Sequence, residues 1–284
     1  MCDTCGCGAT DVRVVDPGSG AVTHTHDGVT HTHQSGEAHS HDGGLTVHTH
    51  EATPVDVAQP DETHEHPRTG STTVELELDV LGKNDALAAE TRAWLAARDL
   101  VAVNLMSSPG SGKTTLLERT IREATDRPVV VVEGDQETLL DAERIRAAGA
   151  RAVQVNTGAG CHLDAEMFSA ALDSLAPEPG SLVMVENVGN LVCPALFDLG
   201  ERARVVVISV TEGDDKPLKY PHMFSAADLV VLNKIDLLPY VDFDVHALMR
   251  HARALRPGVR VLPVSARTGE GLGAWYGWLA GLHS

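Results

Sequence analysis

The glycine-rich stretch SSPGSGKTTLL, from Ser107 to Leu117, decides how the rest of this sequence is interpreted. It follows the apolar run VAVNLM, residues 101–106, and leads into a segment of helical composition. A glycine-rich turn between a buried strand and a helix can point several backbone N–H groups at one anion. We therefore predict a phosphate-binding loop, in which Lys113 reaches the β- and γ-phosphates and the Thr114 hydroxyl binds Mg²⁺. The predicted loop residues are Gly110, Ser111, Gly112, Lys113, Thr114 and Thr115.

The loop departs from the strict pattern G-x-x-x-x-G-K-[ST] at one position, because Ser107 stands where the first glycine belongs. The alternative is a glycine-rich turn that exposes Lys113. An intact GKTT, with a strand before it and a helix after it, favours the phosphate loop.

Apolar runs alternate with helical stretches along the rest of the chain. These runs lack polar alternation, which is typical of strands buried on both faces of a parallel sheet. We predict an α/β fold, a doubly wound and mostly parallel sheet of about six or seven strands that forms a P-loop domain. The runs are VAVNLM, PVVVVE, RAVQVN, SLVMVE, RVVVISV, DLVVLN and VRVLPV.

The stretch NKID, residues 233–236, decides which nucleotide is expected. A carboxylate there can accept hydrogen bonds from N1–H and the 2-amino group of guanine, and adenine offers neither donor. Together with SART, residues 265–268, it predicts GTP rather than ATP. The predicted base-binding residues are Asn233, Lys234, Asp236, Ser265 and Ala266.

Two acidic stretches at predicted strand ends, EGDQET and ENVGN, are candidates for the chemistry at the phosphates. We predict that Asp135 and Glu186 lie around Mg²⁺ and that the Gly189 amide lies near the γ-phosphate. With Lys113 they form the predicted catalytic set. Either acid could instead be a solvated loop charge, and no Gln or Arg that would position the attacking water can be named from the sequence.

The composition limits the partners and the compartment. The net charge of -18 argues against a nucleic-acid binder, because Lys and Arg are too few to neutralise phosphates. No run is long enough to span a membrane and no secretory signal is visible, so the cytoplasm is the expected location. The five cysteines are then expected to be reduced thiols.

The amino-acid composition of the chain changes near residue 73. Residues 8–72 contain few apolar residues and no aromatic ones, so we predict a disordered tail. Residues 73–284 form the predicted GTPase domain, which starts with an amphipathic helix that contains Leu78 and Leu95.

The tail carries five His-x-His pairs. In an extended backbone, residues two apart point the same way, so each pair can offer two imidazoles to one ion such as Ni²⁺, Cu²⁺, Zn²⁺ or Co²⁺. The alternative is a solvating polar linker, and the repeat does not identify the metal. The pairs are His24/His26, His31/His33, His39/His41, His48/His50 and His64/His66.

Two groups of cysteines are further candidates for metal binding. Cys2, Cys5 and Cys7, in the N-terminal motif of residues 1–7, can close around Ni²⁺ or Zn²⁺, with the α-amine as a possible fourth donor. The alternative is a frayed chain end whose thiols bind no metal. Cys161 and His162 are adjacent, and Cys193 follows ENVG closely. Spacing alone does not decide between a metal site and small buried residues for this second group.

Several of these stretches together closely resemble the HypB family, the GTPases of hydrogenase nickel incorporation. The resemblance covers residues 74–284 and the N-terminal cysteine motif. It implies GTP hydrolysis during nickel delivery to the [NiFe]-hydrogenase large subunit, a HypA-type metallochaperone partner, and a homodimer that depends on nucleotide and metal. The matching stretches are CDTCGC, NLMSSPGSGKTTLL, VEGDQET, GAGCHLDA, ENVGNLVCPALFDLG, TEGDDKPLKYP and NKIDLLP.

The resemblance also implies roles for the metal candidates. Cys2, Cys5 and Cys7 match the nickel site of the family, and Cys161, His162 and Cys193 match its nickel or zinc site at the dimer interface. The His-rich segment resembles a nickel store. A urease-accessory GTPase and a nickel buffer with little GTPase turnover remain alternatives; the cysteine arrangement disfavours the first, and Lys113, Thr114, Asp135 and Asp236 disfavour the second.

Overall fold

The computed structural model describes two separate units of the chain, residues 1–68 and 69–284. No helix among the described residues is long and apolar enough to cross a membrane. The backbone is described for residues 13–15, 21–26, 29–34, 39–40, 47–48, 70–124, 127–135, 140–157 and 160–283, and side chains from residue 79 onward apart from those of 135, 140 and 142.

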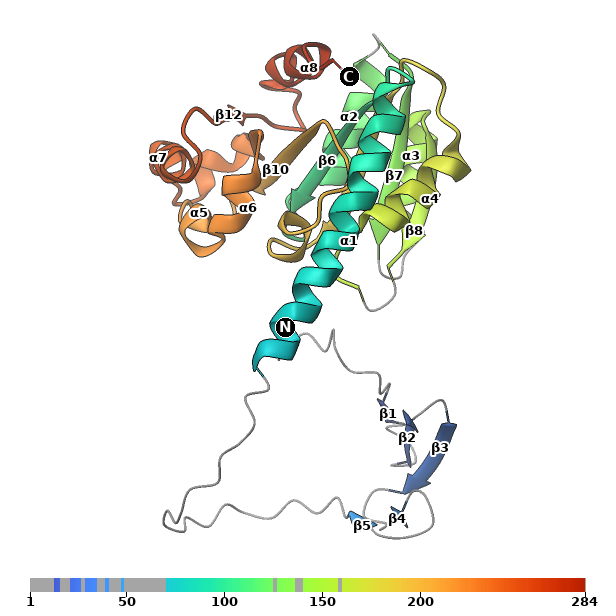
Figure 1. The fold of residues 1–284 in the computed structure, drawn as a ribbon. Helices are drawn as coiled ribbons and strands as arrows, with labels where there is room; N and C mark the ends of the chain where they lie inside the picture. The colour runs from blue at the N-terminus through green and yellow to red at the C-terminus, as the bar shows by residue number, and fades with distance from the viewer. Residues whose placement is uncertain are drawn as a thin grey trace. The chain divides into compact units, whose positions relative to one another are not determined.

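A seven-stranded sheet forms the centre of the second unit (Figure 1). Its order is β12-β11-β10-β6-β9-β7-β8, and every neighbouring pair is parallel. Each of the seven predicted apolar runs forms one strand, so the doubly wound α/β prediction is confirmed. The strands are β6 (Val101–Ser107), β7 (Val129–Asp135), β8 (Arg151–Asn156), β9 (Leu182–Gly189), β10 (Ala203–Ser209), β11 (Leu229–Asn233) and β12 (Arg260–Pro263).

One strand differs from the expectation of burial on both faces. β8 lies at the edge of the sheet, and its residues are half-buried or exposed. Its polar Gln154 is compatible with that position, whereas β6 at the centre is buried along its whole length.

Helices cover both faces of the sheet. The helices are α1 (Gly70–Ala96), α2 (Lys113–Glu123), α3 (Leu140–Ala148), α4 (Ala165–Leu175), α5 (Lys216–Lys219), α6 (Pro221–Ala226), α7 (Val245–Leu255) and α8 (Leu272–Ala280), with 3-10 turns η1 (Cys193–Ala195) and η2 (Ile235–Tyr240). Because alternate residues of a strand point to opposite faces, Val103 packs with α2, α3 and α8. Ala102 packs with α1 and α4, and Met106 with α6 and α7.

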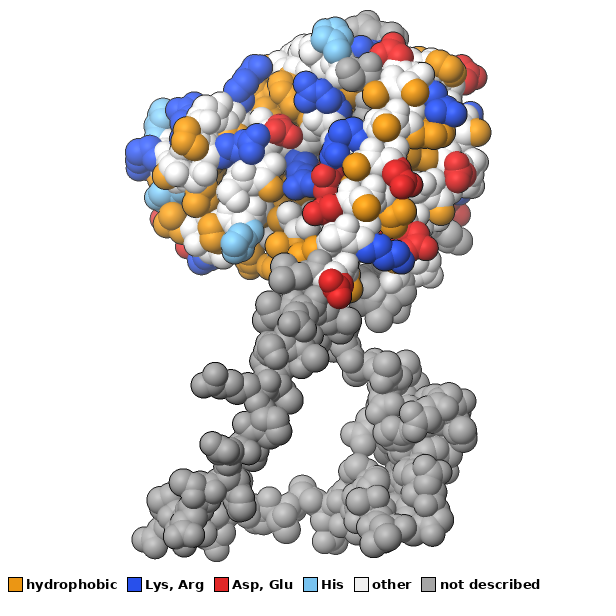
Figure 2. All heavy atoms as spheres, viewed as in Figure 1, with side chains coloured by type: hydrophobic (Ala, Val, Ile, Leu, Met, Phe, Trp, Pro, Cys, Tyr) orange, Lys and Arg blue, Asp and Glu red, His pale blue; other side chains and the backbone are white. Residues whose placement is uncertain are grey.

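The first helix begins well before the predicted Leu78 and crosses one face of the sheet (Figure 1). It comprises 27 residues and begins at Gly70. Polar contacts attach it to the loop before β10: Asn84 Nδ2 donates to the Asp198 carbonyl at 2.8 Å, and Arg92 contacts the Asp198 carboxylate at 2.7 Å. Figure 2 shows acidic and basic side chains interspersed along this face, with apolar ones between them.

The first unit contains short antiparallel strands where the sequence analysis expects a tail without regular structure. β2 (Ala21–His26) pairs with β1 (Arg13–Val15) and β3 (Val29–Gln34), and β4 (His39–Ser40) pairs with β5 (Val47–His48). Their Thr and Val residues favour an extended backbone, which main-chain hydrogen bonds can pair without a core. The expectation of an irregular backbone therefore differs from the structure in these strands.

The strand register distinguishes the histidines of this unit from one another. His24 is paired with His31, and His39 with His48, so backbone positions of different His-x-His pairs are in register there. His33, expected in the irregular tail, instead lies in β3 opposite Val22, and His26 lies in β2 opposite Val29. In the described pairing of β2 with β3, neither of these two histidines therefore stands opposite another histidine.

The metal-binding role of the His-x-His pairs stays a prediction, because the side chains of the first unit lie outside the described residues. The alternation of a strand places His31 and His33 on one face of β3, as the spacing argument requires. The predicted metal ligands whose backbone also lies outside the described residues are Cys2, Cys5, Cys7, His41, His50, His64 and His66.

A glycine lets the loop before β10 approach α1 closely, and it provides a test of the packing. Gly200 has φ +85°, and a Cβ there would meet the Ala88 carbonyl and lie 2.9 Å from the Arg92 nitrogen. Gly180 has φ +81°, with open space around the position of a Cβ. The two positions therefore share the backbone conformation and differ in the contact.

We expect Gly180→Ala to lower the free energy of unfolding by about 1–2 kcal/mol, the cost of a Cβ in a left-handed conformation. Gly200→Ala adds the clash with α1 and should cost about 1–3 kcal/mol more. Urea unfolding of the two variants measures the difference. Equal destabilisation would show that α1 does not pack against Gly200 as described.

Candidate functional site

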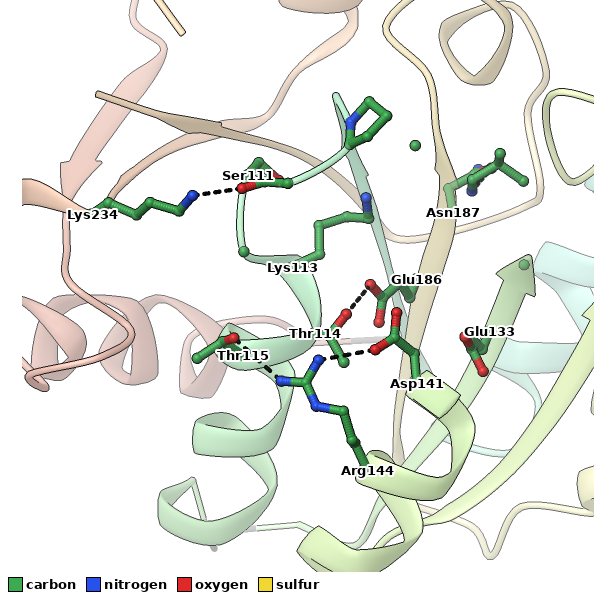
Figure 3. Close-up of a pocket in the computed structure, with 16 residues that line it drawn as sticks. Ser111, Lys113, Thr114, Thr115, Glu133, Asp141, Arg144, Glu186, Asn187 and Lys234 are labelled. Atoms are coloured by element: carbon green, nitrogen blue, oxygen red, sulfur yellow. Dashed lines mark hydrogen bonds and ion pairs between the residues drawn. The ribbon is translucent and has the colours of Figure 1, made fainter. Parts of the chain in front are cut away.

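A cavity of about 540 Å³ opens where β6, β7 and β9 end (Figure 3). The carboxyl ends of parallel strands are where ligands bind in doubly wound sheets. The cavity lining includes every residue of the predicted phosphate loop. The lining residues are Pro109, Gly110, Ser111, Gly112, Lys113, Thr114, Thr115, Glu133, Gly134, Asp141, Arg144, Glu186, Asn187, Val188, Gly189 and Lys234.

Glycine is required at the last turn of the phosphate loop. Gly112 precedes α2 with φ +95°, and a Cβ there would lie only 2.5 Å from the Asn233 side-chain nitrogen. Lys113 follows it, is 8% exposed, and donates to Ser107 Oγ at 2.6 Å. The serine that departs from the phosphate-loop pattern thus holds the ammonium group of the loop lysine.

An acidic cluster lies beside the start of α2. Thr114 Oγ1 donates to Glu186 Oε1 at 2.8 Å, while Glu186 Oε2 is buried without a hydrogen-bond partner. Glu133 on β7 is paired in register with Glu186, and Asp141 of α3 lines the same cavity. A hydroxyl and several carboxylates are the oxygen donors that Mg²⁺ prefers, so these residues fit that ion.

Burial dominates the electrostatics of Glu186. It raises the pKa of the carboxyl, and the positive charge of Lys113 and the hydrogen bond from Thr114 oppose that shift. The side chain is 6% exposed, so its ionised form lacks compensation from solvent.

Three charged residues of the lining are not among the predicted site residues. Glu133 lies within EGDQET, but only Asp135 was chosen there; the Asp135 backbone ends β7, and its side chain lies outside the described residues. Asp141 and Arg144 belong to no recognised motif. Arg144 donates to Asp141 Oδ1 at 2.9 Å and contacts Glu118 at 3.2 Å, so this guanidinium is held by carboxylates at the edge of the cavity.

The two stretches predicted to bind the base are joined to each other and to the phosphate loop. Asn233 Nδ2 donates to the Ser111 carbonyl at 2.9 Å, and its Oδ1 accepts from the Ala266 amide at 3.0 Å. Ser265 Oγ donates to Asp236 Oδ1 at 2.6 Å. Lys234 Nζ donates to the Gly110 carbonyl at 2.6 Å. The five predicted residues therefore meet beside the phosphate loop.

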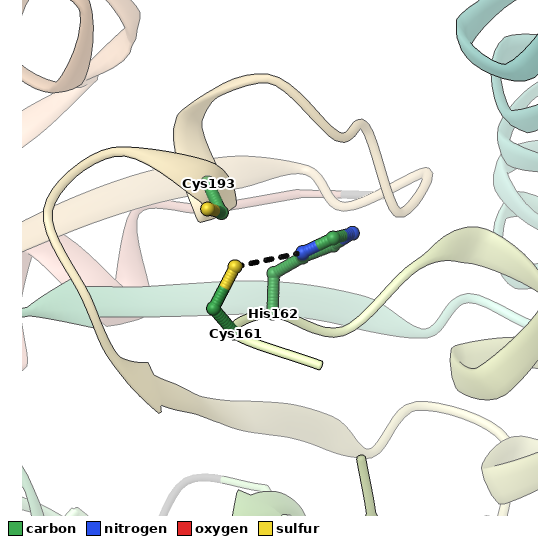
Figure 4. A group of neighbouring side chains, drawn as sticks. All are labelled: Cys161, His162 and Cys193. Carbon is green, nitrogen blue, oxygen red and sulfur yellow. Dashed lines mark hydrogen bonds between the residues drawn. The ribbon is translucent and has the colours of Figure 1, made fainter. Parts of the chain in front are cut away.

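Cys161, His162 and Cys193 form a second cluster (Figure 4). One donor atom from each lies within 4.8 Å of the other two, and Cys161 Sγ is 3.6 Å from His162 Nδ1. The His162 ring stacks on Phe197 at a centroid distance of 3.8 Å. Burial lowers the pKa of His162 against the opposing charge of Asp164, which favours the neutral imidazole that binds metals. Two thiols and an imidazole suit Ni²⁺ or Zn²⁺.

The sequence of this chain is similar to those of known nucleotide-binding proteins. A family model described as the CobW/HypB/UreG nucleotide-binding domain matches residues 101–263. The hydrogenase maturation factor HypB of Rhizobium leguminosarum bv. viciae is 59% identical over 207 residues, which are 72% of this chain and 69% of that protein. The Escherichia coli (strain K12) protein of the same name is 46% identical over 288 residues, 98% of each chain.

Solved structures extend the similarity to the fold. HypB from Helicobacter pylori, crystallised in complex with nickel, is 40% identical with a TM-score of 0.67, over 70% of this chain and 94% of that one. The hydrogenase maturation factor HypB from Archaeoglobus fulgidus is 41% identical with a TM-score of 0.66, over 70% and 98%. The resemblance inferred from the motifs is confirmed. The chain belongs to the HypB family of hydrogenase maturation factors, within the CobW/HypB/UreG nucleotide-binding domains.

Proposed function

We propose that this protein hydrolyses GTP and uses the nucleotide cycle to hold and release nickel during maturation of [NiFe]-hydrogenase. The observation that carries the proposal is the presence of a phosphate cavity and a thiol–imidazole cluster in one domain. The relatives named hydrogenase maturation factor HypB support the biological role, and the nickel complex of the Helicobacter pylori protein supports the cargo.

At the phosphates, this chain contributes positive charge and backbone donors. The N-terminus of α2 and Lys113 are suited to bind the β- and γ-phosphates, and the Gly189 amide to bind the γ-phosphate. Thr114, Glu186 and Asp135 would hold Mg²⁺, which when bound neutralises charge that develops on the phosphate oxygens.

Asp236 is the proposed selector for guanine. Its carboxylate can accept from N1–H and the 2-amino group of the base, and Ser265 fixes one of its oxygens by a hydrogen bond. Adenine presents neither donor, so the carboxylate would lose its partners with ATP.

Nickel is the proposed cargo of the Cys161–His162–Cys193 cluster, which can bind Zn²⁺ as well. A single chain offers three donors here, and a homodimer would provide further ones. We propose Cys2, Cys5 and Cys7 as a second nickel site and the His-rich segment as a nickel store, supported by the strand pairing of His24 with His31. A cytoplasmic location would keep these thiols reduced.

The proposed partners are a HypA-type metallochaperone and the large subunit of [NiFe]-hydrogenase. A second candidate client is urease, because a Helicobacter pylori relative, 42% identical over 197 residues, is named hydrogenase/urease maturation factor HypB. The deciding experiment loads the full chain with nickel and GTP and measures nickel transfer to purified precursors of the two large subunits. We expect transfer to the hydrogenase precursor; transfer to the urease precursor alone would overturn the proposed client.

The first prediction of this function concerns the base. Asp236→Asn should weaken GTP binding by about 10²-fold and improve binding of xanthosine triphosphate, because an amide donates where the carboxylate accepted. The Asn oxygen can still accept from Ser265, so the melting temperature should change little. Calorimetric titration measures both affinities. Equal affinity of the unchanged protein for ATP and GTP would contradict the assignment.

The second prediction separates stability from activity at Glu186. Glu186→Gln keeps an acceptor for Thr114 and removes a buried charge. We expect Mg²⁺-dependent GTP hydrolysis to fall by about 10²-fold or more, because charge stabilisation at the phosphates is lost. Steady-state kinetics against Mg²⁺ concentration measure this loss, and an unaltered rate would remove Glu186 from the catalytic set.

The same variant should be more stable than the parent when nucleotide and Mg²⁺ are absent. Because the folded-state pKa of Glu186 is raised, its contribution to stability is present at low pH and is lost as the pH rises through that pKa. Gln does not ionise, so the advantage of the variant should vanish at acidic pH and grow toward neutral pH. Denaturation in EDTA at several pH values tests the sign.

The third prediction separates the two kinds of nickel site. Deletion of residues 8–68 should lower the number of nickel ions bound per chain and leave GTP hydrolysis within about 2-fold, because the phosphate cavity is formed by later residues. Cys193→Ala is the complementary variant: it keeps the His-rich segment and should lose the thiolate–nickel absorption of the internal site. Loss of hydrolysis in the deletion would mean that the first unit is part of the catalytic domain.

A further inference from the structure

Asn187 occupies a junction between the phosphate cavity and the Cys161–His162–Cys193 cluster. It follows Glu186 on β9, lines the cavity and is 1% exposed. Its Oδ1 accepts from the Leu163 amide at 3.2 Å and from the Val188 amide at 2.9 Å. The Leu163 amide is the first backbone donor after His162. The Asn187 side chain therefore connects β9 to the loop that carries Cys161 and His162, the metal loop.

The hydrogen bond of its nitrogen atom sets the orientation of the Asn187 side-chain amide. Asn187 Nδ2 donates to Asn104 Oδ1 at 3.2 Å, and Asn104 Nδ2 donates to Glu201 Oε1 at 3.2 Å. The same Glu201 oxygen accepts from Arg204 Nε at 2.7 Å. Because a carboxylate can only accept here, Asn104 must present its oxygen to Asn187, and Asn187 must present its own oxygen to Leu163.

Leu163 also contacts the neighbouring strand of the cavity. A Cβ on Gly134 would lie 2.7 Å from Leu163 Cγ, so the leucine side chain packs directly against the strand end between Glu133 and Asp135. Leu163 is fully buried. The metal loop therefore rests on the ends of both β7 and β9, which carry acids of the phosphate site.

Both halves of the metal cluster are attached to β9 by different means. Cys193 is joined covalently, four residues after Gly189. Cys161 and His162 belong to a distant part of the chain, and the hydrogen bond from Leu163 to Asn187 joins them to the same strand. A displacement of the end of β9 would therefore reach Cys193 through the chain, and Cys161 and His162 through this hydrogen bond.

We propose that Asn187 is the positioning residue that couples occupancy of the phosphate cavity to the geometry of the Cys161–His162–Cys193 site. The inference rests on the proposed function. Here Thr114 donates to Glu186; engagement of these two groups with Mg²⁺ and GTP replaces that hydrogen bond. The end of β9 then adjusts, and Asn187 moves the Leu163 amide and the adjacent His162 with it. Linkage requires that metal in turn alters nucleotide affinity.

Asn84 provides a matched control within the same chain. It is 6% exposed, accepts from the Ala165 amide at 2.9 Å and donates to the Asp198 carbonyl at 2.8 Å. It thus attaches the segment after the metal loop to α1, and it does not line the phosphate cavity. Asn84→Ala removes a similar buried amide without touching β9.

The experiment uses the full chain with Cys2, Cys5 and Cys7 replaced by Ser, so that thiolate–nickel absorption reports Cys161 and Cys193 alone. Nickel affinity is measured with GDP and with a non-hydrolysable GTP analogue. We expect the affinities to differ by about 5-fold or more, a typical allosteric coupling. In Asn187→Ala the ratio should fall to within about 2-fold, and Asn187→Asp, which keeps the acceptor for Leu163, should retain most of it. Asn84→Ala should keep the parental ratio even where both affinities weaken.

A measurement on the unsubstituted protein tests the role of Asn187 even if the Asn187→Ala variant does not fold. Hydrogen exchange of the Leu163 amide should differ between the GDP and GTP-analogue states, whereas exchange of the Ala165 amide should not. A parental affinity ratio in Asn187→Ala, or equal exchange at Leu163 in both states, overturns the role of Asn187. Complete absence of thiolate–nickel absorption in the parent contradicts the proposed nickel site, and the coupling inference fails with it.

Discussion

A carboxylate buried at the end of a central parallel strand is unfavourable unless hydrogen bonds or a cation compensate its charge. Glu186 is held in this way by the Thr114 hydroxyl, with Lys113 close enough to oppose the effect of burial on its pKa. One of its oxygens still has no hydrogen-bond partner. The protein's own groups therefore leave this carboxylate incompletely satisfied, a condition that favours binding of a cation together with phosphates.

The contacts of Ser107 explain why serine can stand at the first position of the phosphate-loop pattern. The Ser107 hydroxyl accepts from the Lys113 ammonium and donates to the Ser108 carbonyl at 2.7 Å. A glycine could provide neither contact. Lys113 is thus oriented toward the cavity by the loop itself before any phosphate arrives, which reduces the ordering cost of binding.

Two sites with different chemistry share β9. Hard oxygen donors gather where the strand meets β7, and the soft sulfur and nitrogen donors gather where the chain leaves the strand. The amides of Asn187 and Asn104 connect these regions through a buried network that ends on Glu201 and Arg204. Such a network is costly when partly satisfied and makes the core rigid when complete.

Local pattern in the sequence determined the sheet, the phosphate loop, the NKID and SART stretches, and the pairing of Cys161 with His162. Each depends on neighbouring residues, on strand periodicity or on turn chemistry, and these patterns can be recognised without knowledge of the fold. The predicted first helix contained Leu78 and Leu95, and the structure begins it earlier, at Gly70. The contacts of Asn84 and Arg92 with Asp198, 106 or more residues away, attach the later part of this helix to the domain. Only the tertiary structure brought Glu133, Asp141 and Arg144 to the cavity and Asn187 to Leu163. The phosphate loop is far from these residues along the chain, and a single polar residue has the same local signature whether it serves packing or a site.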